Sequence, residues 1–228
     1  MRMHSIYLAP LLLALVACKT TPTVTIDQRA QQLVDRAAKL EPTVTPALVS
    51  LAEGLGGEMY KIEHRLKTLK STKRKLNKEH LEDPSIPIAE MELDDTLRYT
   101  MRFEDEPAGH YVESVRKVLQ ALEGQGHTVV RLKNYWPQDD NYSGVNGVMK
   151  HPSGMEWELQ FHTAMSLKVQ KDTRDWYEEL RKVDTPIERK RELFDLMTDA
   201  WSKVPVPKDV LEPKSLHANE EIRDRDRP

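Results

Sequence analysis

Residues 127–163, HTVVRLKNYWPQDDNYSGVNGVMKHPSGMEWELQFHT, decide the fold of this chain. Three runs within them, at 127–133, 144–150 and 155–161, are rich in β-branched and aromatic residues and have the length of strands. The Pro-Ser-Gly turn at 152–154 joins the last two runs into a hairpin. The stretch therefore predicts the centre of a β-sheet.

The segments on either side add one strand and several helices. Residues 97–103, LRYTMRF, alternate large apolar and polar side chains, as a half-buried strand does. Residues 110–122 carry valines and leucines at helical spacing. Helices are also expected over 27–40, which Asp27 would cap and which would end before Pro42, and over 46–55, 58–80, 164–182 and 187–202. The pattern predicts an α+β fold in which helices flank a mixed sheet, followed from residue 204 by a disordered tail.

The composition excludes several classes of protein. With 39% hydrophobic residues, 31% charged residues and a net charge of −3, the chain is neither a disordered polyelectrolyte nor a uniformly basic nucleic-acid binder. Its single cysteine excludes an internal disulfide and a thiolate-rich metal site.

That cysteine, Cys18, ends an N-terminal segment with the features of an export signal. The apolar run at 6–17 is shorter than the roughly 20 residues that a membrane-spanning helix needs. Residues 15–18, LVAC, resemble the bacterial lipobox, in which the cysteine becomes the lipidated first residue. The resemblance implies a signal peptide at 1–17 and a lipidated tether at 18–25. Because Lys19 follows, it also implies the outer membrane of the cell envelope as the location. A short anchor and a buried helix are the alternatives.

Cations and carboxylates occur at positions that suit phosphate chemistry. Helical spacing would place several polar residues of the segment 58–80 on one face, where they could contact successive phosphates of a nucleoside triphosphate. These residues are Arg65, Lys67, Ser71 and Lys75. Asp95 precedes the first strand and Glu158 lies in the last, and carboxylates at facing strand ends could share Mg²⁺. The alternatives are plain surface charge, a strand cap at Asp95 and an edge residue at Glu158.

Five segments, in order, resemble the synthetase domain of the RelA/SpoT-type (p)ppGpp synthetases. Residues 65–71, RLKTLKS, are similar to its R-x-K-x-x-x-S element, and Asp95 resembles the aspartate that opens its D-x-x-G-x-R strand. Residues 129–135 (VVRLKNY), 142–146 (YSGVN) and 158–163 (ELQFHT) resemble its segments ending in K-D-Y or K-D-F, its Y-R-S-L-H and its E-I-Q-I-R-T segments. The match covers residues 58–182.

The resemblance implies a nucleotidyltransferase-like fold that moves pyrophosphate from ATP to the 3′-hydroxyl of a guanosine nucleotide. The residues that would hold the ATP phosphates are Arg65, Lys67, Ser71 and Lys75. Asp95 and Glu158 would be the catalytic pair and the ligands of Mg²⁺, and Glu158 would also assist deprotonation of the acceptor hydroxyl. The acceptor would be bound by Tyr142, which would stack on its base, by Lys133, which would contact its phosphates, and by Asn146 and His162.

The sequence departs from this family mainly on the acceptor side. Arg98 and Thr100 stand where the family has its strand glycine and arginine. Ser143 and His162 replace arginines, Asn146 replaces a histidine, and residues 139–140 are aspartates where the family tends to have a lysine. Because positive charge is lost there, the acceptor stays open between GDP or GTP, an adenosine nucleotide and an RNA hydroxyl.

The residue patterns and the resemblance together divide the chain into N-terminal helices at 26–57, a synthetase-like domain at 58–203 and the tail at 204–228. We expect an exported lipoprotein enzyme, held in a lipid bilayer by Cys18, which acts as a toxin or effector with an immunity or delivery partner. The alternative is a non-catalytic envelope lipoprotein that uses the fold as a binding or scaffolding module. RNA binding by the basic segment is a third and weaker interpretation, because that segment has no interleaved aromatic residue apart from Tyr60. Nucleic acid is therefore a less favoured partner, but it is not excluded.

Overall fold

The computed structural model describes residues 24–137 and 141–222, and within them six strands form one mixed sheet. The strands are β1 (Glu58–Met59), β2 (Arg98–Arg102), β3 (Thr128–Asn134), β4 (Val145–Lys150), β5 (Glu156–His162) and β6 (Glu220–Ile222). Their order is β1-β2-β5-β4-β3-β6. The pairs β2–β5 and β3–β6 are parallel, and the other three pairs are antiparallel.

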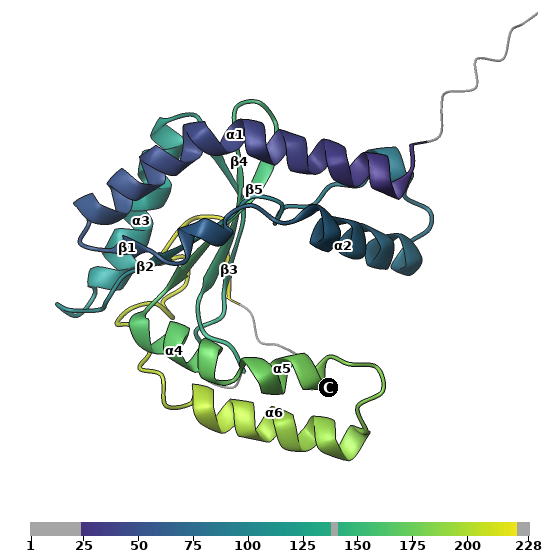
Figure 1. Ribbon diagram of the computed structural model, residues 1–228. Helices are drawn as coiled ribbons and strands as arrows, with labels where there is room; N and C mark the ends of the chain where they lie inside the picture. Colours follow the sequence, from purple (N-terminus) through teal and green to yellow (C-terminus); the bar gives the residue numbers. More distant parts are fainter. Residues whose placement is uncertain (1–23, 138–140, 223–228) are drawn as a thin grey trace, which may run out of the picture.

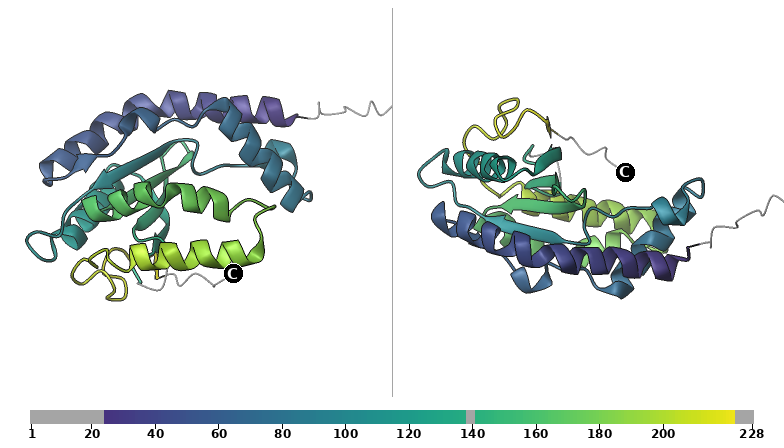
Figure 2. Two further views of the ribbon diagram at one scale, coloured as in Figure 1. Left: turned by 60° about the horizontal axis from the view of Figure 1, so that its bottom comes forward. Right: turned by 90° about the horizontal axis from the view of Figure 1, so that it is seen from above.

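Helices lie on both sides of this sheet. They are α1 (Ile26–Gly54), α2 (Leu69–Glu82), α3 (His110–Gly124), α4 (Ala164–Asp172), α5 (Arg174–Leu180) and α6 (Ile187–Trp201), with short 3₁₀ turns η1 (Ile62–His64) and η2 (Ile88–Glu90). Figures 1 and 2 show α1 on one side of the sheet and α4, α5 and α6 on the other. The predicted α+β class is therefore confirmed.

Alternation along the strands gives the sheet one apolar and one polar face. Tyr99 and Met101 of β2 are buried, and their register partners Leu159 and Phe161 in β5 are buried with them. These four residues belong to the same core cluster as the inner faces of α1 and α3. The polar residues between them face the other side, towards α4–α6.

The strand predictions are confirmed with small shifts at the ends, as is the helix at residue 110. The predicted hairpin is also present, since β4 and β5 pair antiparallel with Lys150 opposite Glu156. The sequence predicts these elements because each has a local pattern: apolar residues alternate with polar ones in the strands, and they form a single stripe in α3.

The predicted break of the first helix at proline is wrong. α1 runs unbroken through Pro42 and Pro46. Its buried positions continue across both prolines at steps of four residues, as at Leu40, Val44 and Leu48, and we infer that tertiary packing of this face outweighs the backbone hydrogen bonds that proline removes.

The start of α1 also differs from the prediction. Asp27 was expected to cap it, but Thr25 is the N-cap. The Thr25 hydroxyl accepts from the Gln28 backbone N–H at 3.2 Å, while the Gln28 side chain accepts from the Thr25 N–H at 2.9 Å. This reciprocal capping box satisfies two backbone donors that Asp27 alone would leave open.

The predicted basic helix at 58–80 is wrong in its first half. Glu58 and Met59 pair with the end of β2, and Leu66 forms a bridge to Leu97. α2 begins only at Leu69, because Thr68 caps it. Arg65 therefore ends the 3₁₀ turn at Ile62–His64, and Lys67 lies in the segment between this turn and α2, so neither shares a helical face with Lys75.

Two predictions about the C-terminal half also need correction. The predicted helix 164–182 divides at Thr173, which is buried and whose hydroxyl donates to the Val169 carbonyl at 2.8 Å. The predicted disordered tail is ordered over residues 204–222: Val204, Val210 and Leu216 are buried, and β6 completes the sheet.

The C-terminal segment lies beside α3, as the right view of Figure 2 shows. Nη2 of Arg116 donates to the Ser215 carbonyl at 2.7 Å, and His217 lies 3.1 Å from Glu123. The segment escaped prediction because its buried residues are spaced irregularly among prolines and charges, so that no local period marks them.

The predicted signal peptide at 1–17 and the lipidation site Cys18 lie outside the described residues. In the part of the chain that the structure describes, no helix is long and apolar enough to cross a membrane. The domain boundaries remain predictions, although α1 and the strands contribute to one core cluster.

Candidate functional site

The polar face of the sheet brings side chains from four strands into two rows. In one row, Arg98 of β2 lies opposite Glu158 of β5. The other row, taken from β2 to β3, consists of Thr100, Gln160, Asn146 and Lys133. The Thr100 hydroxyl donates to Gln160 Oε1 at 3.1 Å, and Gln160 Nε2 donates to Glu158 Oε1 at 2.8 Å. The two rows are thus connected through the carboxylate of Glu158.

Glu158 has the electrostatic character of a proton acceptor. Burial raises the pKa of its carboxyl group, and the negative charges of Asp95 and Asp94 add to this effect. The positive charge of Arg98 and the hydrogen bond from Gln160 act against burial but do not cancel it. A carboxylate with a raised pKa at a cavity wall is suited to take a proton from a bound hydroxyl.

Asp95 lies in the loop before β2, where two lysines reach it from different segments. Nζ of Lys67 forms a hydrogen-bonded ion pair with Oδ2, and Nζ of Lys75, from α2, lies 3.0 Å from Oδ1. Burial by itself would raise the pKa of Asp95, but the hydrogen bond from Lys67 and the charge of Lys75 outweigh burial and lower it. Asp95 likewise raises the pKa of Lys75 against the effect of burial.

Asp94 connects this charged cluster to β3, across the same face of the sheet. Its carboxylate lies 3.0 Å from the guanidinium group of Arg131 in β3 and 3.7 Å from Nζ of Lys75. A cavity of about 140 Å³, which includes Asp94, Arg131, Lys133 and Glu158 in its lining, opens beside the cluster. The structure therefore brings Lys67, Lys75, Asp95 and Glu158 into one region. Their role at a phosphate site remains a prediction.

The two other predicted donor residues are held by local contacts. Arg65 donates from Nε to Glu41 of α1 at 2.6 Å and from Nη1 to the Ile62 carbonyl at 3.0 Å. Ser71 lies in the first turn of α2, and its hydroxyl accepts from the Thr68 hydroxyl at 3.0 Å. Their contact with ATP remains a prediction.

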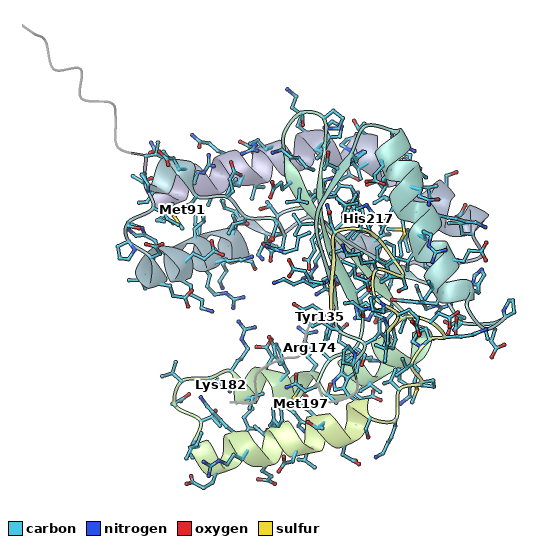
Figure 3. The ribbon with its side chains drawn as sticks, turned by 180° about the vertical axis from the view of Figure 1, so that it is seen from behind. Met91, Tyr135, Arg174, Lys182, Met197 and His217 are labelled. Atoms are coloured by element: carbon cyan, nitrogen blue, oxygen red, sulfur yellow. The ribbon has the colours of Figure 1, made fainter. Side chains whose placement is uncertain are left out.

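A larger cavity, of about 660 Å³, lies between the polar face of the sheet and helices α4–α6, and the two cavities share Asn146. The sheet contributes Arg98, Thr100 and Gln160 to its wall. The helices contribute Lys171 and Arg174, and Figure 3 shows Arg174 on the side of these helices that faces the sheet. The volume falls in the range of cavities that bind small ligands.

Tyr142, which was predicted to stack on a base, lines this cavity in a fixed orientation. Its hydroxyl donates to Asn146 Oδ1 at 2.8 Å and lies 2.9 Å from Nε2 of His162. Its ring also makes contacts with Tyr135 and Trp201, at centroid distances of 5.6 Å in both cases. These contacts suit Tyr142 to present a pre-oriented ring to a ligand.

His162 does not contact the cavity as predicted. Its side chain is fully buried, and its other ring nitrogen lies 3.0 Å from the Ser166 hydroxyl. Burial lowers the pKa of His162 to about 4, so the ring is neutral at pH 7. We assign His162 a positioning role behind Tyr142, because it is fully buried, contacts the Tyr142 hydroxyl and does not line the cavity.

Gly144 makes room for this arrangement. A Cβ atom added at Gly144 would lie 2.6 Å from Cε1 of His162, closer than side-chain atoms approach one another. The glycine of the YSGVN segment is thus explained by the close approach of its backbone to the histidine ring.

Sequence reasoning missed several cations of the larger cavity. Lys61, Lys171 and Arg174 belong to none of the five motifs, and Arg98 was noted only as a departure. The spacing of Lys171 and Arg174, three residues apart in a predicted helix, was the one signal that they share a face. The aspartates at 139–140 lie outside the described residues.

No known family model matches the sequence, and no curated protein matches it. Solved structures do match the fold. A chain from the complex between the Type VI effector Tas1 and its immunity protein aligns with a TM-score of 0.51 and 18% identity, over 76% of this chain and 96% of that one. A GTP pyrophosphokinase family protein from Streptococcus pneumoniae aligns with a TM-score of 0.51 and 13% identity, over 75% and 86% of the two chains.

The small alarmone synthetase 2 from Bacillus subtilis aligns with a TM-score of 0.50 and 11% identity, over 75% of this chain and 91% of that one. At these identities the likeness concerns the fold alone. The chain therefore has the fold of the pyrophosphokinase and alarmone synthetase structures, which is the fold that the five sequence segments implied.

Proposed function

We propose that this chain is an ATP-dependent pyrophosphokinase that modifies a hydroxyl group of a nucleotide. The observation that carries the proposal is the meeting of Lys67 and Lys75 at Asp95, in the loop that leads into β2, which pairs with β5, the strand that carries the raised-pKa carboxyl group of Glu158. Transfer of a phosphoryl-type group depends mainly on positioning the reactants and on neutralising phosphate charge. The cluster supplies cations for the phosphates and a base for the hydroxyl.

In the proposed reaction, the acceptor hydroxyl attacks the β-phosphorus of ATP. The new bond joins the acceptor oxygen to this phosphorus, and the bond from phosphorus to the bridging oxygen of the α-phosphate breaks, so AMP leaves. Glu158 takes the proton of the hydroxyl. Lys67 and Lys75 would exchange Asp95 for phosphate oxygens, with Arg65 and Ser71 as the further predicted contacts on the ATP side.

Mg²⁺ fits this site as a cofactor that Asp95 and Glu158 would hold. Mg²⁺ is usually bound by one or two carboxylates together with substrate phosphates and water. In the proposal the ATP phosphates would complete the ligands of the ion, because the described residues contain no cluster of three potential protein ligands. When bound, the ion would supply further neutralisation of phosphate charge.

We also propose that Cys18 carries lipid and places the protein in the cell envelope, at the outer membrane. The LVAC sequence supports this location. Because ATP is scarce outside the cytoplasm, the enzyme would act as an effector after delivery into another cell, with an immunity partner in the producing cell. One of the matching structures holds an effector together with its immunity protein.

A transfer assay tests the activity. The full chain in mild detergent is incubated with Mg²⁺, ATP labelled in its terminal phosphates and each of GDP, GTP, ADP, AMP and RNA. We expect labelled product with at least one acceptor, and none from Glu158→Gln. As the control, Lys168→Ala removes an exposed lysine that pairs with Asp172 at 2.6 Å and should keep the activity.

The proposal fails if no acceptor is labelled under conditions in which a known synthetase works. Thermal melting then decides whether the alternative, a non-catalytic binding module, applies. ATP at 100 times its Kd adds ~2.7 kcal/mol to stability, so a melting shift that Lys67→Ala abolishes would indicate binding without transfer.

A further inference from the structure

We propose that Lys171 and Arg174 bind the phosphates of the acceptor nucleotide. The inference assigns a role to two residues that lie outside all five motifs. For its kinetic test it rests on the proposed function, because it concerns the acceptor side of that same site.

The junction of α4 and α5 places both residues at the larger cavity. α4 ends at Asp172 and α5 begins at Arg174. Thr173 between them is 3% exposed and is fixed by its hydrogen bond to Val169. The buried threonine therefore anchors the backbone, and Lys171 and Arg174 on either side of it both line the cavity.

No side chain in residues 24–137 and 141–222 neutralises the charges of Lys171 and Arg174. Neither the Lys171 ammonium group nor the Arg174 guanidinium group has an ion-pair or hydrogen-bond partner among the residues that the structure describes. Two nearby cations do have an acidic partner: Lys168 pairs with Asp172, and the guanidinium group of Arg181 lies 3.7 Å from the carboxylate of Glu178. Unpaired cations that line a cavity attract anions, and Arg binds phosphate in a bidentate manner.

The described lining of the cavity carries excess positive charge. Its lining contains Lys61, Arg98, Lys171 and Arg174, and Glu178 is the one carboxylate among its described lining residues. A low-dielectric cleft lined by one sign of charge concentrates ligands of the opposite sign. A nucleotide with two or three phosphates fits this balance better than a nucleoside monophosphate does.

The position of these cations separates them from the ATP side. Lys67 and Lys75 gather at Asp95, which does not line the larger cavity. Lys171 and Arg174 line the same cavity as Tyr142, the predicted base-stacking residue. The chain thus has two sets of cations: Lys67 and Lys75 near Asp95, and Lys171 and Arg174 at the junction of α4 and α5. In the proposal, the second set supplies the positive charge that is missing on the acceptor side, where Ser143 and Thr100 stand in place of the family's arginines.

The test measures nucleotide binding by calorimetry with the full chain in a Lys67→Ala background, which weakens the donor site. The probes are GTP, GDP, GMP, ATP, ADP and AMP. Against this background, Lys171→Ala/Arg174→Ala should weaken the best di- or triphosphate at least tenfold and the corresponding monophosphate much less. Lys168→Ala/Arg181→Ala removes the same charge from α4–α5 outside the cavity lining, and it should change affinity less than twofold.

The kinetic arm separates this inference from the proposed transfer. With Lys67 intact, the cavity double variant should raise the acceptor KM at least tenfold and leave the ATP KM within twofold, and Arg174→Lys should restore part of the loss. Unchanged acceptor affinity, an equal loss in the control variant, or an equal loss for the monophosphate overturns the inference even when transfer occurs. If binding behaves as expected but no transfer is found, the phosphate site stands and the proposed reaction falls. If no probe binds to the chain with Lys67 intact, both fall.

Discussion

Nζ of Lys75 lies 3.0 Å from Oδ1 of Asp95, and Lys67 pairs with the other oxygen of the same carboxylate. α2 and the segment before it are thereby tied to the start of β2. The pairs are mostly shielded from water, since the exposed fractions of the three side chains lie between 16% and 31%. In the free protein, both lysines that we propose to bind ATP therefore pair with the carboxylate of Asp95.

Replacing Asp95 with Asn should destabilise the protein at neutral pH by about 1–3 kcal/mol, because two half-buried ammonium groups lose their partner. The folded pKa of Asp95 is lowered, so its stabilisation is complete above the unfolded pKa and is lost as pH falls through the folded value. The difference in melting temperature between wild type and Asp95→Asn should therefore shrink below about pH 4. Asp199→Asn, which breaks an exposed pair with Lys203, is the control. Equal losses in the two variants would contradict a special role for Asp95.

Glu158→Gln should reduce the rate of transfer by about 10²–10⁴-fold, the usual contribution of a general base. It should also raise the melting temperature at pH 7. The folded pKa of Glu158 is raised, so the folded state binds this proton more tightly than the unfolded state, and stability falls as pH rises through that range. Wild-type activity should rise with pH through a pKa above 4.5, the ordinary value for this side chain.

The control for Glu158 lies in the same strand. Glu156→Gln removes a carboxylate that lies 4.0 Å from Lys150, and it should leave both the rate and the melting temperature nearly unchanged. Comparable loss of activity in both variants would mean that the overall charge of β5, and no specific base, supports the reaction.

Gly144→Ala should destabilise the chain by about 1–3 kcal/mol, because its Cβ would lie 2.6 Å from the fully buried ring of His162. Gly124→Ala is the matched control, since an added Cβ there meets nothing within 4 Å and a helical alanine is favoured over glycine by up to about 1 kcal/mol. Chemical denaturation of both variants gives the comparison. A tolerated alanine at Gly144 would show that Tyr142 and His162 are free to move.

His162 should make stability sensitive to mild acid. Its folded pKa of about 4 lies below the unfolded value of 6.5, so its contribution is complete above pH 6.5 and is lost as pH falls towards 4. NMR titration of the imidazole protons should detect this low pKa. In His162→Gln the slope of stability against pH should be reduced over this interval, and a slope equal to that of wild type would contradict the assignment.

Local pattern in the sequence was sufficient for much of the fold. The alternation in residues 97–103 and in the segment 127–163 marks strands, because one face of a strand is buried at every second residue. The order of the five segments placed Lys67, Lys75, Asp95 and Glu158 in one predicted site. The structure brings these residues together, even though Lys67 does not lie on the predicted helix.

The tertiary structure alone decided the features that depend on residues distant in the chain. The path of α1 through Pro42 and Pro46 follows from packing against the core. The order in residues 204–222 follows from burial beside α3 and β3.

The acceptor site that we propose at the polar cavity also depends on the tertiary structure. Lys171 and Arg174 have no motif and become significant only where α4 and α5 face Tyr142 and Arg98 across the cavity. The period of apolar residues in a sequence indicates which face of a helix or strand is buried. It does not indicate which other element packs against that face, because the two elements can lie a hundred residues apart and their contact leaves no local pattern in the sequence.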